Sequence, residues 1–345
     1  MKINKFYKRL KKTYIIAEIG VNHNNSLSVA KKLIRKAKIA GADAVKFQTF
    51  SAERLVSPGT RKVKYQKKKS SDKETHYNML KKLELSLKNH KILFNYCKKT
   101  NIEFISTPYD VKSAKFLTKL GIKIFKTASA DLIDYELHKY LATTGKPIII
   151  STGMATIKEI NSTLKIYNKK KGNVSLLHCV SNYPCSPKSL NLNALKILKK
   201  IFNCTIGYSD HSKDNLASCL SVVLGSKIIE KHFTLDKNMM GPDHKASCTP
   251  AELKSMICEI RKTELILGNE IKKKQKEENE MSKISRKSLF YSMSLKKNSL
   301  IKKNTLIALR PGYRVSPMNI PKILGKKIKC DVKMNEPFNF KHITK

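Results

Sequence analysis

The sequence predicts an α/β protein built around a (β/α)8 TIM barrel, followed by a small, mostly β domain at the C-terminus. Short apolar, β-rich segments recur eight times in the first 235 residues, and segments with a helical pattern separate them. The last 60 residues lack a long helical period. A chain of 345 residues is long enough for one barrel of about 250 residues and an appended domain.

Each expected strand is a short apolar run rich in residues that favour β structure. The runs cover residues 14–19, 44–49, 103–108, 122–127, 147–152, 174–180, 205–210 and 226–233. Between them apolar residues repeat with the helical period, which predicts helices over 28–40, 111–120, 133–143, 157–167, 190–200 and 215–224. Strands that alternate with helices form parallel sheets, and eight such units close a barrel.

One connection is much longer than the others. Residues 50–102 separate the second strand from the third and carry a very basic stretch, residues 62–69, ahead of two expected helices. Long loops inside compact domains are often functional. We therefore expect a loop here that covers a substrate.

The chain changes character after a last barrel helix, expected over 250–267. We assign residues 1–268 to the barrel domain and residues 269–284, which are strongly charged and free of glycine, to a linker that is helical in part. Residues 285–345 contain short apolar runs and turn signals such as Arg310-Pro311-Gly312. They predict the small, mostly β domain.

Composition excludes several classes of protein. Lysine and arginine number 70 against 26 acidic residues, so the formal net charge is +44, which could attract RNA or an anionic surface. The lysines are spread over expected helix faces throughout the chain, and we interpret them as a compositional bias with no specific nucleic-acid partner. No stretch reaches the roughly 20 apolar residues of a membrane span, and no signal peptide is evident. We expect a cytoplasmic protein without a membrane partner, whose eight cysteines, none in a C-x-x-C pair, are reduced.

Polar residues mark the end of every expected strand, where the active site of such a barrel lies. They are Glu18, Lys46, Gln48, Ser106, Thr107, Lys126, Ser129, Ser151, Thr152, His178, Ser181, Ser209, His211, Glu230 and His232. Residues two apart on a strand share a face, so Ser209 lies beside His211 and Glu230 beside His232.

The two histidines predict a metal site. A single histidine after a strand is more often a structural residue, but two on neighbouring strands can share a divalent cation. Asp210 or Glu230 is expected to orient an imidazole as a hydrogen-bond partner. Mn, Co, Mg or Zn would suit two imidazoles completed by water and substrate oxygens.

Two lysines predict an anionic substrate. A buried ammonium is costly unless it meets an anion, and Lys46 and Lys126 both point into the expected mouth. Hydroxyl and N–H groups around Ser129 and Ser151 are donors of the kind that hold phosphate or carboxylate oxygens. The alternative is that the lysines pair with carboxylates of the protein, namely Glu18, Asp131 or Glu230.

Nine ordered motifs resemble the sialic acid synthase family, whose members condense phosphoenolpyruvate with an N-acetylated hexose. The motifs are AEIGVNH (17–23), VKFQT (45–49), ISTPY (105–109), KTASAD (126–131), STGMA (151–155), LHCVSNYP (177–184), GYSDH (207–211), EKHFT (230–234) and GPDHKAS (241–247). RPG (310–312) and ILGKK (323–327) resemble the antifreeze-like (SAF) domain that follows the barrel in this family. The resemblance covers residues 13–343.

The resemblance implies a role for each matching residue. His211 and His232 would bind a divalent metal, usually manganese, with magnesium or cobalt also possible. The residues that would hold phosphoenolpyruvate are Lys46, Thr107, Lys126, Ser129, Ser151 and Ser209. Those that would contact the hexose are Gln48, Tyr183, Asp243 and Arg310, and substrate contacts are also implied at Asp131 and Ser181, where some relatives carry glutamate and asparagine.

The family also implies a domain-swapped homodimer, in which Arg310 contacts the hexose held by the other subunit. Glu18 is the expected general base, and the metal would polarise the aldehyde of the hexose. The acceptor is expected to be N-acetylmannosamine or its 2,4-diacetamido-6-deoxy analogue. Residues around 50–75 and 243–247 would determine which hexose binds. By resemblance, residues 243–247 favour the sialic or legionaminic branch. Two alternatives remain: a pseudaminic acid synthase, or a catalytically inactive basic barrel that binds RNA.

Overall fold

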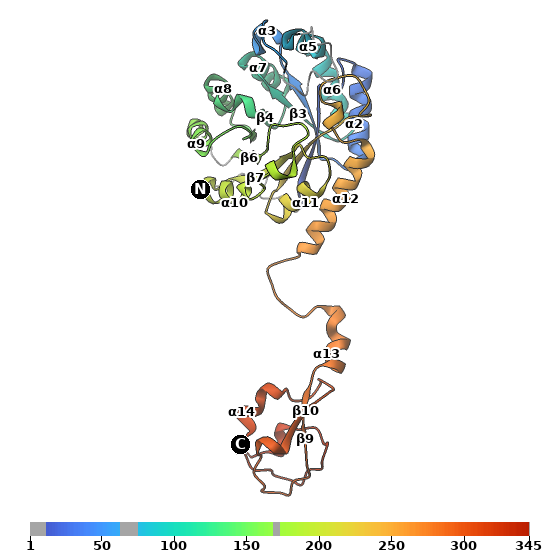
Figure 1. The fold of residues 1–345 in the computed structure, drawn as a ribbon, viewed down its shortest axis with the longest axis vertical. Coiled ribbons are helices and arrows are strands. Elements are labelled where there is room, and N and C mark those ends of the chain that lie inside the picture. Colours follow the sequence, from blue (N-terminus) through green and yellow to red (C-terminus); the bar gives the residue numbers. More distant parts are fainter. Residues whose placement is uncertain (1–11, 63–74, 168–172, 345) are drawn as a thin grey trace. The chain divides into compact units, whose positions relative to one another are not determined.

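The chain folds into two compact units, Met1–Gly268 and Asn269–Lys345. The computed structural model describes residues 12–62, 75–167 and 173–344 (Figure 1). Each unit has its own hydrophobic core. Most of the basic stretch expected to cover a substrate, from residue 63 onward, lies outside the described residues.

Eight parallel strands form a closed barrel in the first unit and follow one another around it in sequence order. Strands β8 and β1 pair through contacts such as Glu230 with Ile16, which closes the cylinder. The predicted barrel is confirmed, and β4 is shorter than expected. The strands are β1 (Tyr14–Gly20), β2 (Ala44–Thr49), β3 (Glu103–Pro108), β4 (Phe125–Thr127), β5 (Ile148–Ser151), β6 (Val174–His178), β7 (Thr205–Asp210) and β8 (Ile228–His232).

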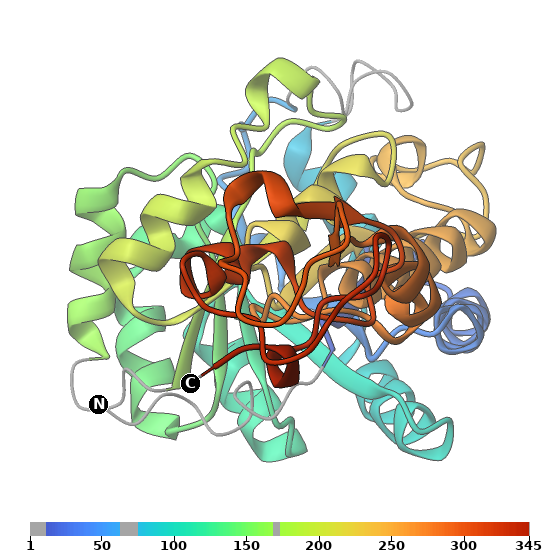
Figure 2. The same cartoon turned by 90° about the horizontal axis from the view of Figure 1, so that it is seen from below.

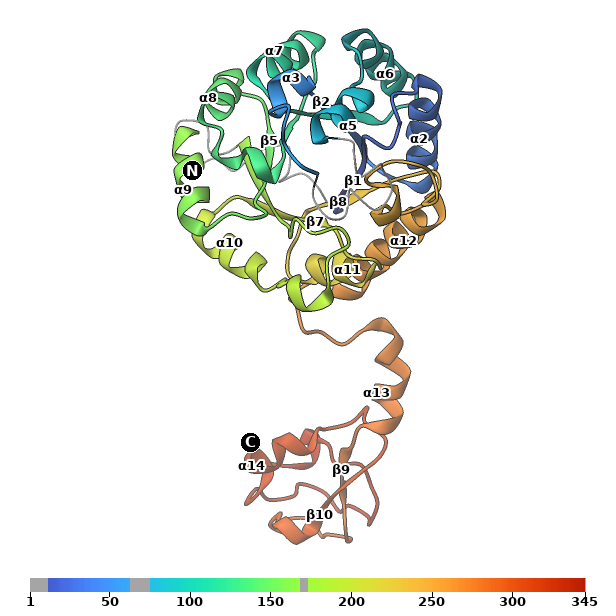
Figure 3. The ribbon, with the colours of Figure 1, turned by 45° about the horizontal axis from the view of Figure 1, so that its top comes forward.

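Helices surround the strands as an outer ring (Figure 3). Several begin at side-chain caps; for example, Asp110 and Asp134 each accept a hydrogen bond from the backbone N–H three residues on. Helix α10 begins four residues later than predicted, because Asn191 has a φ of 42°, which is outside the right-handed helical region. The ring helices are α2 (Leu27–Ala40), α6 (Leu87–Lys99), α7 (Val111–Leu120), α8 (Tyr135–Thr144), α9 (Ile157–Ile166), α10 (Ala194–Phe202), α11 (Leu216–Val223) and α12 (Pro250–Leu267).

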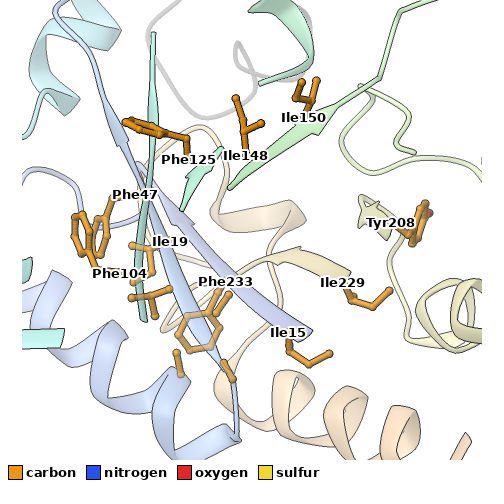
Figure 4. Packing of buried hydrophobic residues seen from close by; sticks show 14 of the residues in the cluster. Ile15, Ile19, Phe47, Phe104, Phe125, Ile148, Ile150, Tyr208, Ile229 and Phe233 are labelled. Carbon is orange, nitrogen blue, oxygen red and sulfur yellow. The ribbon is translucent and has the colours of Figure 1, made fainter. Parts of the chain in front are cut away.

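The alternation of strand side chains produces two cores. Outward-facing residues such as Ile15, Phe47, Phe104 and Ile229 pack beneath the helices (Figure 4). A second cluster fills the inside of the barrel: Tyr14, Ile16, Ala44, Ile105, Ile124, Ile149, Leu177 and Ile228. Two residues further along the strands the inward-facing positions become polar, namely Glu18, Lys46, Thr107, Lys126, Ser151, Ser209 and Glu230. The apolar floor therefore supports a polar layer at the C-terminal mouth.

The long insertion contributes a small core of its own. Besides α6 it contains α3 (Ala52–Leu55) and α5 (His76–Leu83). Helix α5 buries Met79, Leu80 and Leu83 against Val21 and Phe50. This cluster is separate from the barrel core.

The second unit, coloured orange to red in Figure 2, consists of short elements. Helix α13 (Asn279–Ser285) precedes the antiparallel pair β9 (Ser288–Tyr291) and β10 (Leu306–Leu309), and α14 (Ile320–Ile323) follows. Further pairing consists of isolated bridges, such as Leu295 with Val332. The antifreeze-like assignment stays a prediction from the resemblance. No helix in the described part of the chain is long and apolar enough to cross a membrane.

Candidate active site

A cavity of about 550 Å³ opens at the C-terminal mouth of the barrel. Its lining includes almost every predicted site residue of the first unit: Glu18, Lys46, Gln48, Lys126, Ser129, Asp131, Ser151, Ser181, Tyr183, Ser209, His211, His232 and Asp243. Of the first-unit residues to which the resemblance gave a role, Thr107 is the exception. It is fully buried behind Lys46, whose ammonium donates to its hydroxyl at 3.1 Å.

Two lysines and two glutamates form the buried floor of this cavity. Lys46 Nζ lies 2.7 Å from Glu18 Oε2 and 3.9 Å from Glu230 Oε2, and Lys126 Nζ lies 3.5 Å from Glu230 Oε1. The structure therefore shows the alternative, in which the two lysines pair with carboxylates of the protein. Lys46 pairs with Glu18 and Glu230, and Lys126 pairs with Glu230. Strand register explains the cluster, since Glu18 pairs with Lys46 on one side and with His232 on the other.

The two glutamates titrate in opposite directions. Burial raises the pKa of Glu18 to about 7, although the nearby Lys46 charge opposes this rise. Burial also acts to raise the pKa of Glu230, but the charges of Lys126 and Lys46 lower it more, to about 2. Two acids whose environments push their pKa values apart are suited to different roles. Glu18 can exchange a proton near neutral pH, whereas Glu230 remains an anion.

The two histidines meet at the mouth, as predicted. The ring centroids of His211 and His232 are 5.6 Å apart, and Tyr183 lies against His211 at 4.1 Å. His211 Nδ1 is 2.7 Å from the carbonyl oxygen of Val180, to which it donates, so its Nε2 carries the lone pair. His232 Nδ1 is buried without a hydrogen-bond partner.

These imidazoles fit a divalent cation. Burial lowers the pKa of both rings, so they are neutral and able to bind a metal at neutral pH. The described residues contain no group of three or more His, Cys, Asp and Glu side chains arranged to hold a metal ion. The protein would therefore contribute the two imidazoles, and water or substrate oxygens would complete the coordination.

The prediction that Asp210 or Glu230 orients an imidazole is wrong. Asp210 precedes His211 on a strand, so its side chain faces the other way, and its Oδ2 contacts Lys231 Nζ at 2.9 Å. The carbonyl of Val180 orients His211 instead. Glu230 does face the mouth, but it accepts from Ser209 at 3.0 Å and pairs with the lysines.

The ammonium of Lys126 donates to the carbonyl oxygen of Thr127 at 3.0 Å. It also donates to Ser151 Oγ at 2.6 Å, and the backbone N–H of Gly153 donates to Ser129 Oγ at 3.0 Å. Gly153 leaves room for this arrangement, because a Cβ there would stand 2.5 Å from Ser181 Oγ and 2.8 Å from Ser129 Oγ. A side chain at this position would displace the hydroxyls.

Cys179, the residue directly after β6, lines the cavity and was not predicted from the sequence. Its Sγ contacts Ser129 Oγ at 3.0 Å. His178, chosen from the sequence, faces outward, and its Nε2 bonds to the carbonyl of Leu190 at 2.8 Å. Strand alternation predicts that Cys179 faces inward, since it is two residues from the inward-facing Leu177.

Carboxyl groups border the outer part of the cavity. Asp131 Oδ2 is buried without a hydrogen-bond partner, and burial raises the pKa of this residue to about 7. Burial also raises the pKa of Asp243 to about 6, and its Oδ2 lies 3.9 Å from His232 Nδ1. Gln48 donates to Glu18 Oε1 at 3.1 Å.

An apolar wall faces these polar groups, and sequence reasoning did not identify it. The part of the insertion that the structure describes lines the cavity with Leu55, Val56, His76, Met79, Leu80 and Leu83. The spacing of His76, Met79, Leu80 and Leu83 is helical and places them on one face of α5, which the sequence alone could have indicated. Arg310 follows β10 in the second unit and is exposed, and its contact with a hexose in another subunit stays a prediction.

Known proteins resemble the chain over most of its length. It is 45% identical over 320 residues to the N,N'-diacetyllegionaminic acid synthase of Campylobacter jejuni. The aligned region covers 92% of this chain and 96% of that protein. The pseudaminic acid synthase of the same species is 32% identical over 327 residues, 94% of this chain and 95% of the relative.

A solved structure gives the same result. The N-acetylneuraminic acid synthetase of Leptospira borgpetersenii, crystallised with citrate, is 35% identical, with a TM-score of 0.70 over 79% of this chain and 90% of that one. The NeuB family model matches residues 33–272, more than half of the chain. The chain therefore belongs to the NeuB family of sialic acid synthases.

Proposed function

We propose that the protein condenses phosphoenolpyruvate with an N-acetylated hexose and water, and releases a nonulosonic acid and phosphate. One observation carries the proposal: a single cavity contains the buried Lys46 and Lys126, the titratable Glu18, and two adjacent neutral imidazoles. The cations suit the enol phosphate, the carboxyl suits proton transfer, and the imidazoles suit a divalent metal.

Phosphoenolpyruvate would bind at the floor of the cavity. Its phosphate and carboxylate compete with Glu18 and Glu230 for the ammonium groups of Lys46 and Lys126. The hydroxyls of Ser129, Ser151 and Ser209 would donate to its oxygens, and Thr107 would act through Lys46, which it contacts. Charge-assisted hydrogen bonds of this kind are roughly twice as strong as neutral ones.

His211 and His232 would hold the divalent cation, which is manganese by resemblance, with magnesium or cobalt as alternatives. When bound, the cation supplies Lewis-acid polarisation of the aldehyde carbonyl of the open-chain hexose. Asp243, which lies beside His232, and Gln48 would orient the hexose at this end of the cavity.

The reaction would join C3 of phosphoenolpyruvate to the aldehyde carbon, leaving positive charge at C2 and negative charge on the aldehyde oxygen, which takes up a proton to become a hydroxyl. Glu18 would then remove a proton from the water that adds to C2, because its pKa of about 7 lets it act as a base near neutral pH. Breaking the C2–O bond of the tetrahedral adduct releases phosphate. Lys46, 2.7 Å from Glu18, would stabilise the negative charge that moves onto the leaving group.

The proposed acceptor is a 2,4-diacetamido-2,4,6-trideoxy hexose. Of the residues that the described part of the insertion contributes to the cavity, His76 alone is polar. An aliphatic wall favours the 6-methyl group and the methyl of the 4-acetamido group over the hydroxyls of N-acetylmannosamine, which would lose hydrogen bonds to water. The likeness to a legionaminic acid synthase supports the same acceptor.

The test is incubation of the chain with phosphoenolpyruvate, Mn²⁺ and a panel of N-acetylated hexoses. The panel includes N-acetylmannosamine, the manno-configured 2,4-diacetamido-6-deoxy hexose and its altro isomer. Phosphate release and product mass are recorded. The proposal requires hexose-dependent phosphate release with one nonulosonic acid formed per phosphate; tight RNA binding without turnover would support the inactive basic barrel instead.

A further inference from the structure

A buried ion pair lies on the outer face of the barrel, beside the two histidines. Asp210 and Lys231 are direct neighbours across β7 and β8, and their charged atoms are 2.9 Å apart. They are 1% and 3% exposed. Because side chains alternate along a strand, the pair faces away from the cavity, while His211 and His232, one residue further along each strand, face into it.

The pair also organises the loop that follows β7. Lys231 Nζ donates to the carbonyls of Ser212 at 2.8 Å and Asp214 at 3.0 Å. Asp210 accepts from the backbone N–H of Ser212 at 2.8 Å and from Ser218 Oγ at 2.6 Å. His211 thus lies between Asp210, which belongs to the ion pair, and Ser212, whose backbone is hydrogen-bonded to both members of the pair.

These contacts bear on the distance between the imidazoles. The ammonium belongs to the residue just before His232, and it binds the carbonyl of the residue just after His211. Elsewhere His211 is held by single bonds, from Cys185 N to its carbonyl at 2.8 Å and from its Nδ1 to Val180, and by a 3.4 Å contact between its Nε2 and Ser209 Oγ. A buried ion pair is weak evidence for stability, since apolar residues of similar size often serve as well.

We propose that Asp210 and Lys231 form a positioning pair, which fixes His211 relative to His232 and thereby sets the affinity of the two imidazoles for a divalent cation. Neither residue reaches the cavity, so neither is catalytic. The inference rests on the proposed function in one respect, namely that the synthase uses a cation at these histidines.

The experiment measures Mn²⁺ binding by the full chain without substrates, from the electron paramagnetic resonance signal of free Mn²⁺. The variants are Lys231→Met, Asp210→Asn and the double variant Asp210→Asn/Lys231→Met. We expect each to weaken Mn²⁺ binding by about 10- to 100-fold, the range typical when residues behind a metal ligand are removed. The control is Lys123→Met, which removes an exposed 3.0 Å pair with Glu103 at the opposite end of the barrel and leaves the affinity unchanged.

Urea unfolding of the same proteins separates positioning from stability. A merely structural pair would lower the free energy of unfolding while the folded variants bind Mn²⁺ like the wild type, and this result would overturn the proposal. If a single variant does not fold, the double variant decides, because it leaves no unpaired buried charge. Wild-type protein that binds no Mn²⁺ would also overturn it.

The proposed function is tested separately. A wild-type chain that releases no phosphate with any hexose contradicts the synthase activity, while the differences in Mn²⁺ affinity still decide the role of the pair.

Discussion

Glu18 and Glu230 both contact Lys46, yet burial and charge give them different pKa values. We predict that Glu18→Gln lowers kcat by about 10²- to 10⁴-fold, the usual contribution of general acid–base catalysis. The KM for phosphoenolpyruvate should stay the same or fall, because Gln keeps the size of the side chain and no longer competes as an anion for Lys46. Steady-state kinetics measure both constants, and unchanged turnover would show that Glu18 is not the base.

The pKa of Glu18 also predicts a pH dependence. A base acts as the carboxylate, and burial raises the pKa of Glu18 to about 7, so kcat should rise as the pH increases through neutrality. A bound cation would lower this pKa and move the rise to lower pH. The Glu18→Gln variant should lose this part of the profile. If its remaining activity shows the same rise, another group is responsible.

Gly153 permits the crowding of hydroxyls around the proposed phosphoenolpyruvate site. In Gly153→Ala the new Cβ would meet Ser181 Oγ at 2.5 Å and Cys179 Sγ at 2.9 Å, so these side chains must shift. We predict at least a tenfold higher KM for phosphoenolpyruvate, from the loss of about one charge-assisted hydrogen bond. Gly59→Ala is the control, since a Cβ there meets no atom within 4 Å. Equal KM values in both variants would contradict this account.

At the scale of elements, helix α5 forms the apolar wall of the cavity. Met79→Gln keeps the length of the side chain and adds an amide, so it should reduce the preference for the diacetamido-6-deoxy hexose over N-acetylmannosamine by roughly tenfold. The ratio of the two kcat/KM values measures this preference. Asn78→Gln, on the exposed side of α5, should leave the ratio unchanged. A lower kcat/KM for both hexoses with a constant ratio would mean that the wall does not select the acceptor.

The strands were the part of the fold that the sequence predicted well. Period-two alternation places Glu18, Lys46, Ser209 and His211 on the inward face, and the structure brings them together. The same rule, applied strictly, would have turned Asp210 outward and selected Cys179 in place of His178. Chemical type alone does not determine which face of a strand a side chain occupies.

The apolar wall could not be predicted in the same way. It depends on how α5 packs against Val21 and Phe50, residues that are distant in sequence and belong to a cluster separate from the barrel. Helical spacing shows that α5 has an apolar face but does not say what that face contacts. The partners of the two lysines were likewise open, because several carboxylates occupy the strand ends.

At the scale of the whole molecule, in the swapped dimer that the family resemblance implies, Glu18 of one chain and Arg310 of the other would share one site. Arg310→Ala alone should raise the KM for the hexose by about 10- to 100-fold, as expected for a lost hydrogen bond to a charged group. Glu18→Gln and Arg310→Ala chains, unfolded and refolded together in equal amounts and assayed with hexose well below the wild-type KM, should recover about a quarter of wild-type activity. Half of the dimers are then mixed, and one of the two sites in each is intact.

The refolding experiment has a clear control. Each variant refolded alone should remain at its own low activity. If the mixture shows only the average of the two variants, Glu18 and Arg310 belong to the same chain's site or Arg310 does not contact the hexose.

The central claim is that the barrel mouth joins phosphoenolpyruvate to an N-acetylated hexose. The most direct measurement is product mass together with phosphate release, using Mn²⁺ and phosphoenolpyruvate labelled with ¹⁸O in the bridging position. We expect one nine-carbon acid per phosphate released. The label should be in the phosphate, because the bond between C2 and the bridging oxygen breaks. Phosphate release that does not depend on any hexose, or label retained in the organic product, would contradict it.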